Sequence, residues 1–226
     1  YADSADWEIT DNTNYTIDFW VKHDDHAGNE EYVVHYQDNS NRWNIFHNNG
    51  NGLKFTLSVP GNSEYITTGY GGEITDTNWH HIALCKVGSA YAIYKDGIQV
   101  NYTSSANTGN RAGSLYVGQS GGSSDYFDGR VQELRIATEN SFSASPVSGL
   151  TDTITVPSAQ HTSDSNTKLL LHMDWNGDRD SGNTGHTQSG GTQPDWSNVN
   201  GRFGVGSMEF DGTDDHFSIA DSADWD

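Results

Sequence analysis

The stretch Tyr15-Thr-Ile-Asp-Phe-Trp-Val-Lys22 decides the fold of this chain. Its apolar side chains occupy every second position and are Tyr15, Ile17, Phe19 and Val21. Successive side chains of an extended chain point to opposite sides, so a period of two gathers these residues on one face. The stretch therefore predicts a β-strand with one buried face.

Comparable stretches fill most of the remaining sequence. Further strands are predicted at Glu31–Gln37, Trp43–His47, Leu53–Val59, His80–Val87, Tyr91–Tyr94, Ile98–Tyr102, Ser114–Gly118, Arg130–Ile136, Lys168–Asp174 and Met208–Ile219. Asp96-Gly97, between two of them, favours the positive φ angles of a tight hairpin. Because the chain has 25 glycines and no sustained 3.6-residue apolar period, helices should be few and short. We therefore predict an all-β chain folded as an antiparallel β-sandwich.

The charge of the chain limits its partners. Asp and Glu number 31 and Lys and Arg number 11 among 226 residues, which gives a formal net charge of −20. Phosphate backbones and anionic lipids attract clustered Lys and Arg, so we expect no nucleic acid and no anionic membrane as partner. No apolar run approaches the roughly 20 residues of a membrane helix, which predicts no membrane insertion. An aromatic content of 12% nevertheless indicates a folded chain.

The single cysteine, Cys85, excludes an internal disulfide and a thiolate metal cage. The apolar residues around it predict a buried strand thiol, and a reactive thiol is the alternative.

The chain divides into three parts. Residues 1–137 carry most of the predicted strands and form the main body. Residues 138–167 are rich in Ser, Thr, Asp and Asn and are predicted to be a polar connector. Residues 168–226 return to strand patterns. The sequence Ala2–Trp7 recurs letter for letter as Ala220–Trp225, which predicts a parent protein built from tandem repeats.

Several motifs together carry a family resemblance. In chain order they are Thr16–Val21, Trp79–Ala83, Tyr94–Gly97, Leu115–Gly118 and Tyr126–Ile136. The chain resembles a concanavalin A-like, laminin G-like jelly roll over nearly its whole length. Lys168–Asp174, Asp180–Asn183 and Ser207–Gly212 look like that family's opening segment, so the resemblance implies a circularly rotated strand order. The strands of 168–226 are then expected to complete the sandwich of the same chain or of a neighbouring chain.

Oxygen-bearing side chains recur at every second position from Asp174, the last residue of the predicted strand Lys168–Asp174. They are Asp174, Asn176, Asp178 and Asp180, a spacing found in calcium loops. Laminin G-like domains often hold one structural calcium, so the resemblance implies Ca²⁺ here, and a solvated acidic turn is the alternative. The family often has Asp where this chain has Gln132.

Other polar clusters allow weaker hypotheses. His23-Asp-Asp-His26 could bind a transition metal through imidazoles three residues apart, or form a solvated loop. Asp211–Asp215 is expected to be an acidic turn between two strand halves, and a ligand role is the alternative. Family relatives that cleave polysaccharides pair carboxylates on one strand, as Glu209 and Asp214 would. Because these residues also match the non-catalytic opening motif, we expect no enzyme, and a polysaccharide hydrolase is a remote third hypothesis.

Sugar recognition needs flat aromatic faces and planar amides or carboxylates. Residues of these types on or beside the mid-chain strands are Tyr36, Trp43, Asn44, Asn49, Tyr65 and Tyr70, and packing is the alternative for each. Trp20 and Trp79 lie within strand motifs and are expected to belong to the framework.

These observations predict a non-catalytic adhesion or recognition module of a tandem-repeat protein that is extracellular or on a virion surface. Its partner would be a glycan or a cell-surface polysaccharide. The alternative is a structural fibre subunit whose partners are neighbouring repeats or identical subunits, joined head to tail by strand exchange.

Overall fold

The computed structural model describes residues 14–26, 28–58, 65–106, 113–121, 124–174, 188–189, 195–197, 201–204 and 206–219. All regular structure in these ranges is β-strand, so the all-β prediction is confirmed. No helix in these ranges has the length and apolar character needed to span a bilayer. The repeated segments Ala2–Trp7 and Ala220–Trp225 lie outside the described residues.

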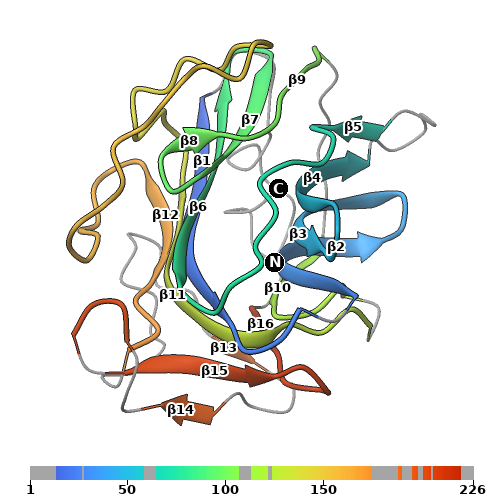
Figure 1. The fold of residues 1–226 in the computed structure, drawn as a ribbon, viewed down its shortest axis with the longest axis vertical. Helices are drawn as coiled ribbons and strands as arrows, with labels where there is room; N and C mark the ends of the chain where they lie inside the picture. Colours follow the sequence, from blue (N-terminus) through green and yellow to red (C-terminus); the bar gives the residue numbers. More distant parts are fainter. Residues whose placement is uncertain are drawn as a thin grey trace.

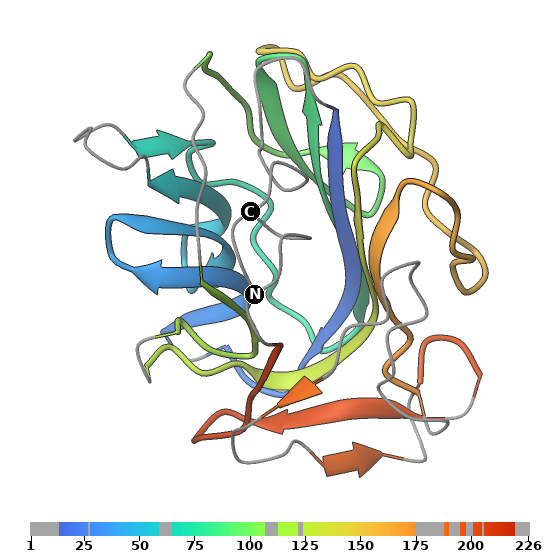
Figure 2. The same ribbon diagram turned by 180° about the vertical axis from the view of Figure 1, so that it is seen from behind.

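Two antiparallel sheets face each other and form the predicted sandwich (Figures 1 and 2). Sheet A has the order β14 (Asp195–Ser197), β15 (Ser207–Asp211), β11 (Asp128–Ala137), β1 (Tyr15–His23), β6 (Trp79–Val87), β7 (Ala90–Lys95) and β8 (Ile98–Gln99). In the same sheet β12 (Thr167–Leu171) pairs with β11, and β9 (Thr103–Ser104) pairs with β7. Sheet B has the order β13 (Gln188–Ser189), β16 (Phe217–Ile219), β10 (Ser114–Val117), β2 (Asn29–Asp38), β3 (Asn41–Asn48), β4 (Gly52–Ser58) and β5 (Tyr65–Thr67).

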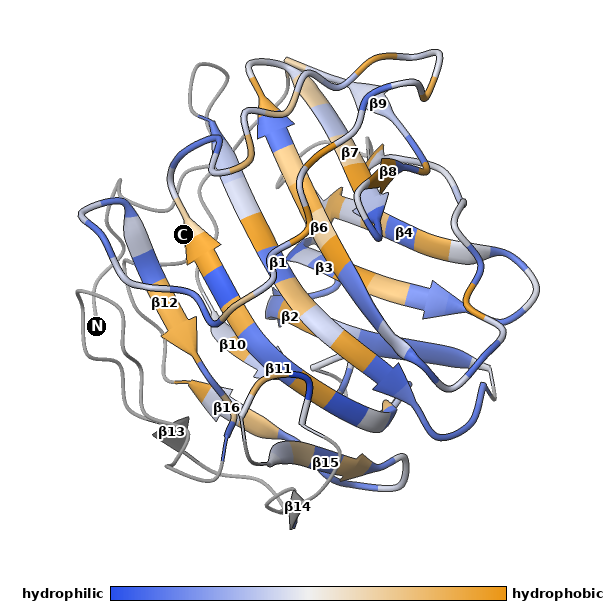
Figure 3. Ribbon diagram, turned by 60° about the vertical axis from the view of Figure 1, so that its left-hand side comes forward, coloured by the Kyte–Doolittle hydropathy of each residue, from blue (hydrophilic) through white to orange (hydrophobic). Residues whose placement is uncertain are grey.

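The alternation in β1 places its apolar side chains in the core, as predicted. Tyr15, Ile17, Phe19 and Val21 all belong to the main cluster between the sheets. Bands of alternating hydropathy run along β1 and β11 (Figure 3). The polar face of β1 is buried as well, since Thr16 and Asp18 have no exposed surface and Trp20 has 3%. The expectation of a single buried face was therefore wrong.

Residues 138–167 lie along the outside of sheet A and cover most of that second face, whereas Arg202 and Phe203 cover Trp20 (Figure 1). Ala144 and Ile154 pack with Cys85 and Tyr94 in a second apolar cluster on this side of the sheet. Thr153 forms a β-bridge with Ile98. The polar segment is thus a covering layer of the sheet as well as a connection between β11 and β12.

Asp18 anchors this layer. Its Oδ1 accepts a hydrogen bond from Nε of Arg135 at 2.8 Å, and its Oδ2 accepts one from Nε2 of His161 at 2.7 Å and one from Nε2 of His81 at 3.1 Å. Burial raises the pKa of Asp18, but the bonds from the two histidines and the nearby positive charges outweigh it and hold this pKa below its usual range.

The strands of the tail pair with the body of the same chain. β12 and β15 both pair with β11, and β16 pairs with β10. The predicted strand Met208–Ile219 is broken into β15 and β16 by the turn that follows Asp211. Gly212 adopts a φ of 71° in this turn, and a Cβ there would lie 2.7 Å from the Cβ of Asp128. The turn therefore carries the chain from sheet A to sheet B.

Two local predictions are confirmed. Asp96 and Gly97 have φ angles of 51° and 84° and connect β7 to β8 as a two-residue hairpin. Cys85 is fully buried, and burial raises the pKa of its thiol far above the ordinary value. It is therefore a packing residue of the strand and not a nucleophile.

Candidate functional site

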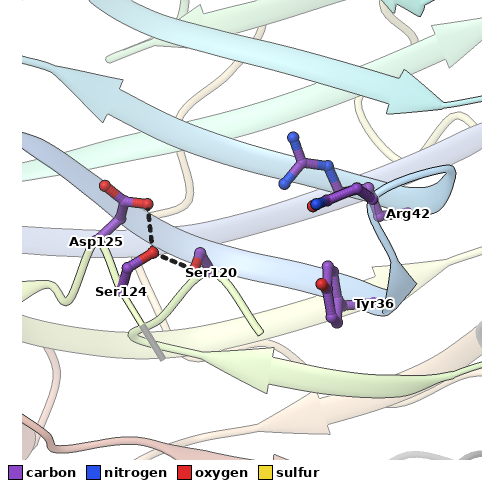
Figure 4. A pocket seen from close by; sticks show the side chains of 6 residues that line it. Tyr36, Arg42, Ser120, Ser124 and Asp125 are labelled. Carbon is purple, nitrogen blue, oxygen red and sulfur yellow. Dashed lines mark hydrogen bonds between the residues drawn. The ribbon is translucent and has the colours of Figure 1, made fainter. Parts of the chain in front are cut away.

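A polar cavity of about 350 Å³ opens at one end of sheet B (Figure 4). Its lining comes from the end of β2, the turn into β3, β3 itself and the loop after β10. The lining residues are Tyr36, Asn39, Arg42, Ser120, Ser124 and Asp125. Tyr36 and Arg42 are direct cross-strand partners in the β2–β3 pair, so the sheet fixes their spacing.

The aromatic wall of the cavity is the ring of Tyr36. Gly121 lies against this ring with a φ of 80°, and a Cβ at that position would lie 2.5 Å from the Tyr36 Cγ. The edge of the ring meets Tyr116, with centroids 6.5 Å apart. The absence of a side chain at Gly121 thus lets the loop after β10 close onto the ring.

The polar walls of the cavity are Arg42 and a short chain of oxygens. Oγ of Ser124 donates to Oδ2 of Asp125 at 2.9 Å and lies 3.0 Å from Oγ of Ser120. Within the described part of the chain Arg42 forms no ion pair, and its buried Nε has no hydrogen-bond partner. The guanidinium therefore keeps donors for a ligand. One aromatic face with opposed cationic and anionic groups suits a small polyhydroxyl molecule.

Tyr36 is the predicted glycan-binding residue that lines this cavity. The interpretation of Trp43 and Asn44 as sugar contacts was wrong, because both are buried. Trp43 is 1% exposed in the core, with its ring 6.0 Å from that of His35. Nδ2 of Asn44 donates to both carboxylate oxygens of Glu31, at 2.8 and 3.0 Å.

The Glu31–Asn44 contact continues to Thr56, whose hydroxyl donates to Oδ1 of Asn44. Asn44 on β3 lies opposite Thr56 on β4 and reaches diagonally to Glu31 on β2. Burial raises the pKa of Glu31 to about 8, although the bond from Asn44 opposes the shift. The amide of Asn44 therefore holds three strands together and leaves no group for a sugar.

Among the remaining predicted glycan residues, Asn49 and Tyr70 are not part of the cavity lining. Asn49 is exposed, and its N–H donates to the carbonyl of Gly28 at 2.9 Å. Tyr70 is 45% exposed, with Nζ of Lys54 4.5 Å from its ring centroid. Tyr65 begins β5, and its side chain is outside what the structure describes. The predicted set therefore does not form one site.

The sequence did not identify Arg42, Ser120, Ser124 or Asp125. Arg42 is one of only 11 basic residues, which is a weak signal. The loop that carries Asp125 contains the glycines and serines of an ordinary turn. It lines the cavity only because it packs against Tyr36 in the fold. No local pattern predicts such a long-range contact.

Only part of the predicted calcium loop is described. Asp174 is 9% exposed, and its Oδ2 accepts a hydrogen bond from Nε2 of Gln160 at 3.3 Å. Asn176, Asp178 and Asp180 lie outside the described residues, so calcium at this loop stays a prediction.

Gln132 has a structural role in this fold. Its Oε1 accepts the N–H groups of Arg202 and Phe203 at 2.6 and 3.0 Å. Its Nε2 donates to the carbonyls of Phe203 and Gly206 at 2.8 and 3.1 Å. An amide can both donate and accept hydrogen bonds, whereas an ionised carboxylate can only accept them. Gln132 can therefore bind both the N–H groups and the carbonyls of residues 202–206.

The remaining acidic residues singled out in the sequence, Asp211–Asp215 and Glu209, form contacts with neighbouring residues. Oδ1 of Asp211 accepts the N–H of Thr213 at 2.8 Å, which is the expected acidic turn. Carboxylates of Asp211, Asp214 and Asp215 gather there without a further sign of a ligand. Oε1 of Glu209 lies 2.8 Å from Nη2 of Arg130, an ion pair across two strands of sheet A.

Comparisons with known proteins agree with this architecture. A family model described as the concanavalin A-like lectin/glucanases superfamily matches residues 1–147. The chain belongs to this superfamily, and its jelly roll is the one that the sequence predicted. A crystal structure of a native heptameric SAP-like pentraxin from Limulus polyphemus is similar at 18% identity and a TM-score of 0.41, over 62% of this chain and 73% of the pentraxin. No curated protein matches the chain.

Proposed function

We propose that the chain is a non-catalytic recognition module that binds a glycan in the cavity beside Tyr36. The observation that carries the proposal is the lining itself, which combines an aromatic ring, a guanidinium with unused donors and a carboxylate. The superfamily contains lectins and glucanases, which supports a saccharide as the ligand. The Arg130–Glu209 ion pair supports binding without catalysis, because it engages the carboxylate that hydrolysis would need.

Each lining group has a defined task in this proposal. The face of the Tyr36 ring packs on the C–H face of a pyranose. Arg42 donates hydrogen bonds to neighbouring hydroxyl oxygens, and the carboxylate of Asp125 accepts from hydroxyl hydrogens. A cavity of about 350 Å³ admits one or two sugar rings at a chain end or branch, so recognition covers a terminal saccharide.

The setting of this function is also a proposal. Laminin G-like domains are generally extracellular, and a net charge of −20 keeps such a module soluble and apart from anionic surfaces. We therefore place the module in an adhesion protein outside the cell, with a cell-surface polysaccharide as partner. Calcium at Asp174 and the residues that follow it is a separate proposal.

A glycan array followed by calorimetry tests the proposal. The wild-type chain should bind a subset of glycans, and Tyr36→Ala and Arg42→Gln should each weaken binding about 10-fold or more, as lost stacking or charged hydrogen bonds do. Tyr70→Ala is the matched control, because Tyr70 is an exposed tyrosine outside the cavity lining. Binding that depends on Tyr70 and not on Tyr36 would contradict the proposal, as would an array without any signal.

A further inference from the structure

A second cluster of functional side chains lies buried at the end of β1. His23 ends β1, Glu30 lies near the start of β2, and His47 lies near the end of β3. The exposed fractions of these side chains are 0%, 1% and 0%. One potential ligand atom from each lies within 4.8 Å of the others. Three strands from two sheets thus bring two imidazoles and one carboxylate to a single point.

The contacts inside the cluster leave polar atoms unsatisfied. Oε2 of Glu30 lies 2.7 Å from Nδ1 of His23 and 3.9 Å from Nδ1 of His47. Within the described part of the chain neither Glu30 oxygen has a hydrogen-bond partner of good geometry, and Nδ1 of His47 has none. A buried carboxylate without aligned donors is costly, so the arrangement calls for a cation between these atoms.

The groups around the cluster are those that orient metal-bound histidines. Oη of Tyr32 lies 2.6 Å from Nε2 of His23, and Oε1 of Glu73 lies 3.6 Å from Nε2 of His47. If His47 binds a metal through Nδ1, its proton moves to Nε2 and faces Glu73. The protonated Nε2 can then no longer accept the 3.3 Å hydrogen bond from the N–H of Ile74, and the contact with Glu73 takes its place. A carboxylate behind a ligating imidazole fixes the tautomer and raises its basicity.

A fourth group borders the same point. The ring of His26 lies 4.8 Å from that of His23 and 6.3 Å from that of His47, measured between centroids. Among the described residues neither buried ring nitrogen of His26 has a hydrogen-bond partner. Unlike His23 and His47, His26 as a whole residue is partly exposed, although its ring nitrogens are buried beside the cluster.

We propose that His23, Glu30 and His47 bind a first-row transition metal ion, with zinc as the physiological candidate and His26 or water in the fourth position. Two imidazoles and one carboxylate are a common ligand set for zinc. Calcium takes oxygen ligands, so this site and the calcium predicted after Asp174 select different metals. The His23–His26 spacing indicated only one edge of the site, since Glu30 and His47 reach it through the sandwich.

Zinc binding to the full chain tests the proposal. Protein stripped with a chelator and desalted should take up one Zn²⁺ per chain at this site and melt at a higher temperature. Substitution with Co²⁺ should give the visible bands of a tetrahedral site, and X-ray absorption of the zinc complex should detect at least two imidazoles. An all-oxygen shell, or no uptake by the wild-type chain, would overturn the proposal without any variant.

Variants then locate the site. Glu30→Gln and His47→Gln should each weaken zinc affinity by more than the roughly 10- to 100-fold that loss of an outer-shell partner costs. Glu31→Gln and His35→Gln are the matched controls, because they change a neighbouring buried glutamate and a buried histidine of β2 outside the cluster. The controls should retain wild-type affinity. Equal losses in the controls, or full affinity in Glu30→Gln, would refute the assignment.

Discussion

The substitution Asp18→Asn tests how the covering layer is fastened to sheet A. The carboxylate is completely buried and accepts hydrogen bonds from Arg135, His81 and His161. Asparagine has nearly the same shape but no charge, and its NH₂ group would face one of these donors. Removing one member of a buried charged network costs about 3–5 kcal/mol, so we expect a loss in this range at pH 7.

Urea unfolding followed by tryptophan fluorescence measures this loss. With a slope of about 2–3 kcal/mol per molar urea, the midpoint should fall by about 1–2.5 M with an unchanged slope. Asp38→Asn is the control. Asp38 accepts the N–H of Ser40 and the side-chain amide of Asn41 in an exposed turn, where water replaces a lost bond, so its midpoint should match the wild type.

The stability that Asp18 contributes should depend on pH. The pKa of Asp18 is lower in the folded chain than its ordinary value of 3.8. The ionised carboxylate therefore adds stability that is fully present above this value and is lost as the pH falls below it. The difference between the wild type and Asp18→Asn should shrink by about 1.4 kcal/mol per pH unit below pH 3.8. A difference under 1 kcal/mol at pH 7, or one that persists unchanged in acid, would refute the reasoning.

Three further predictions concern the cavity, the loop at Gln132 and the closure of the sandwich. Gly121→Ala should push the loop off Tyr36 and weaken glycan binding while secondary structure in circular dichroism is retained; unchanged affinity would contradict it. Gln132→Leu should lower stability by about 2–4 kcal/mol, because four hydrogen bonds to the backbone of Arg202, Phe203 and Gly206 are lost, and a neutral result in thermal unfolding would contradict this. Because the tail strands pair with their own chain, light scattering should give a monodisperse species of 24.8 kDa, whereas filaments that grow with concentration would favour strand exchange.

The sequence predicted the strands well because their signal is local. The alternation in Tyr15–Lys22 and the turn at Asp96-Gly97 depend on neighbouring residues alone, and both are confirmed. The period-two pattern identifies one apolar face, but it says nothing about what covers the other. The polar composition of 138–167 predicted a polar connector and did not indicate that hydrogen bonds to residues such as Asp18 let this segment pack on a sheet.

The site was harder to predict because its residues meet only in the fold. Trp43 and Asn44 are adjacent in sequence and have sugar-binding chemistry, yet one fills the core and the other joins strands. Tyr36, a predicted glycan-binding residue, lines the cavity, but Asp125 on the opposite wall comes from a loop far along the chain. The type of a residue indicates what it can bind, and only long-range contacts decide whether it is free to do so.

Histidine–carboxylate contacts recur in the described part of the chain. On the outside of sheet A they fasten one segment to another. Asp18 holds His161, and Glu133 holds His172 and the backbone N–H of His161. The contact between His23 and Glu30 differs, because it joins the two ends of one short loop and its carboxylate lacks aligned donors. A fastening role explains the outer pairs but not the inner one, and a bound cation would give the Glu30 oxygens and Nδ1 of His47 the partner that they lack.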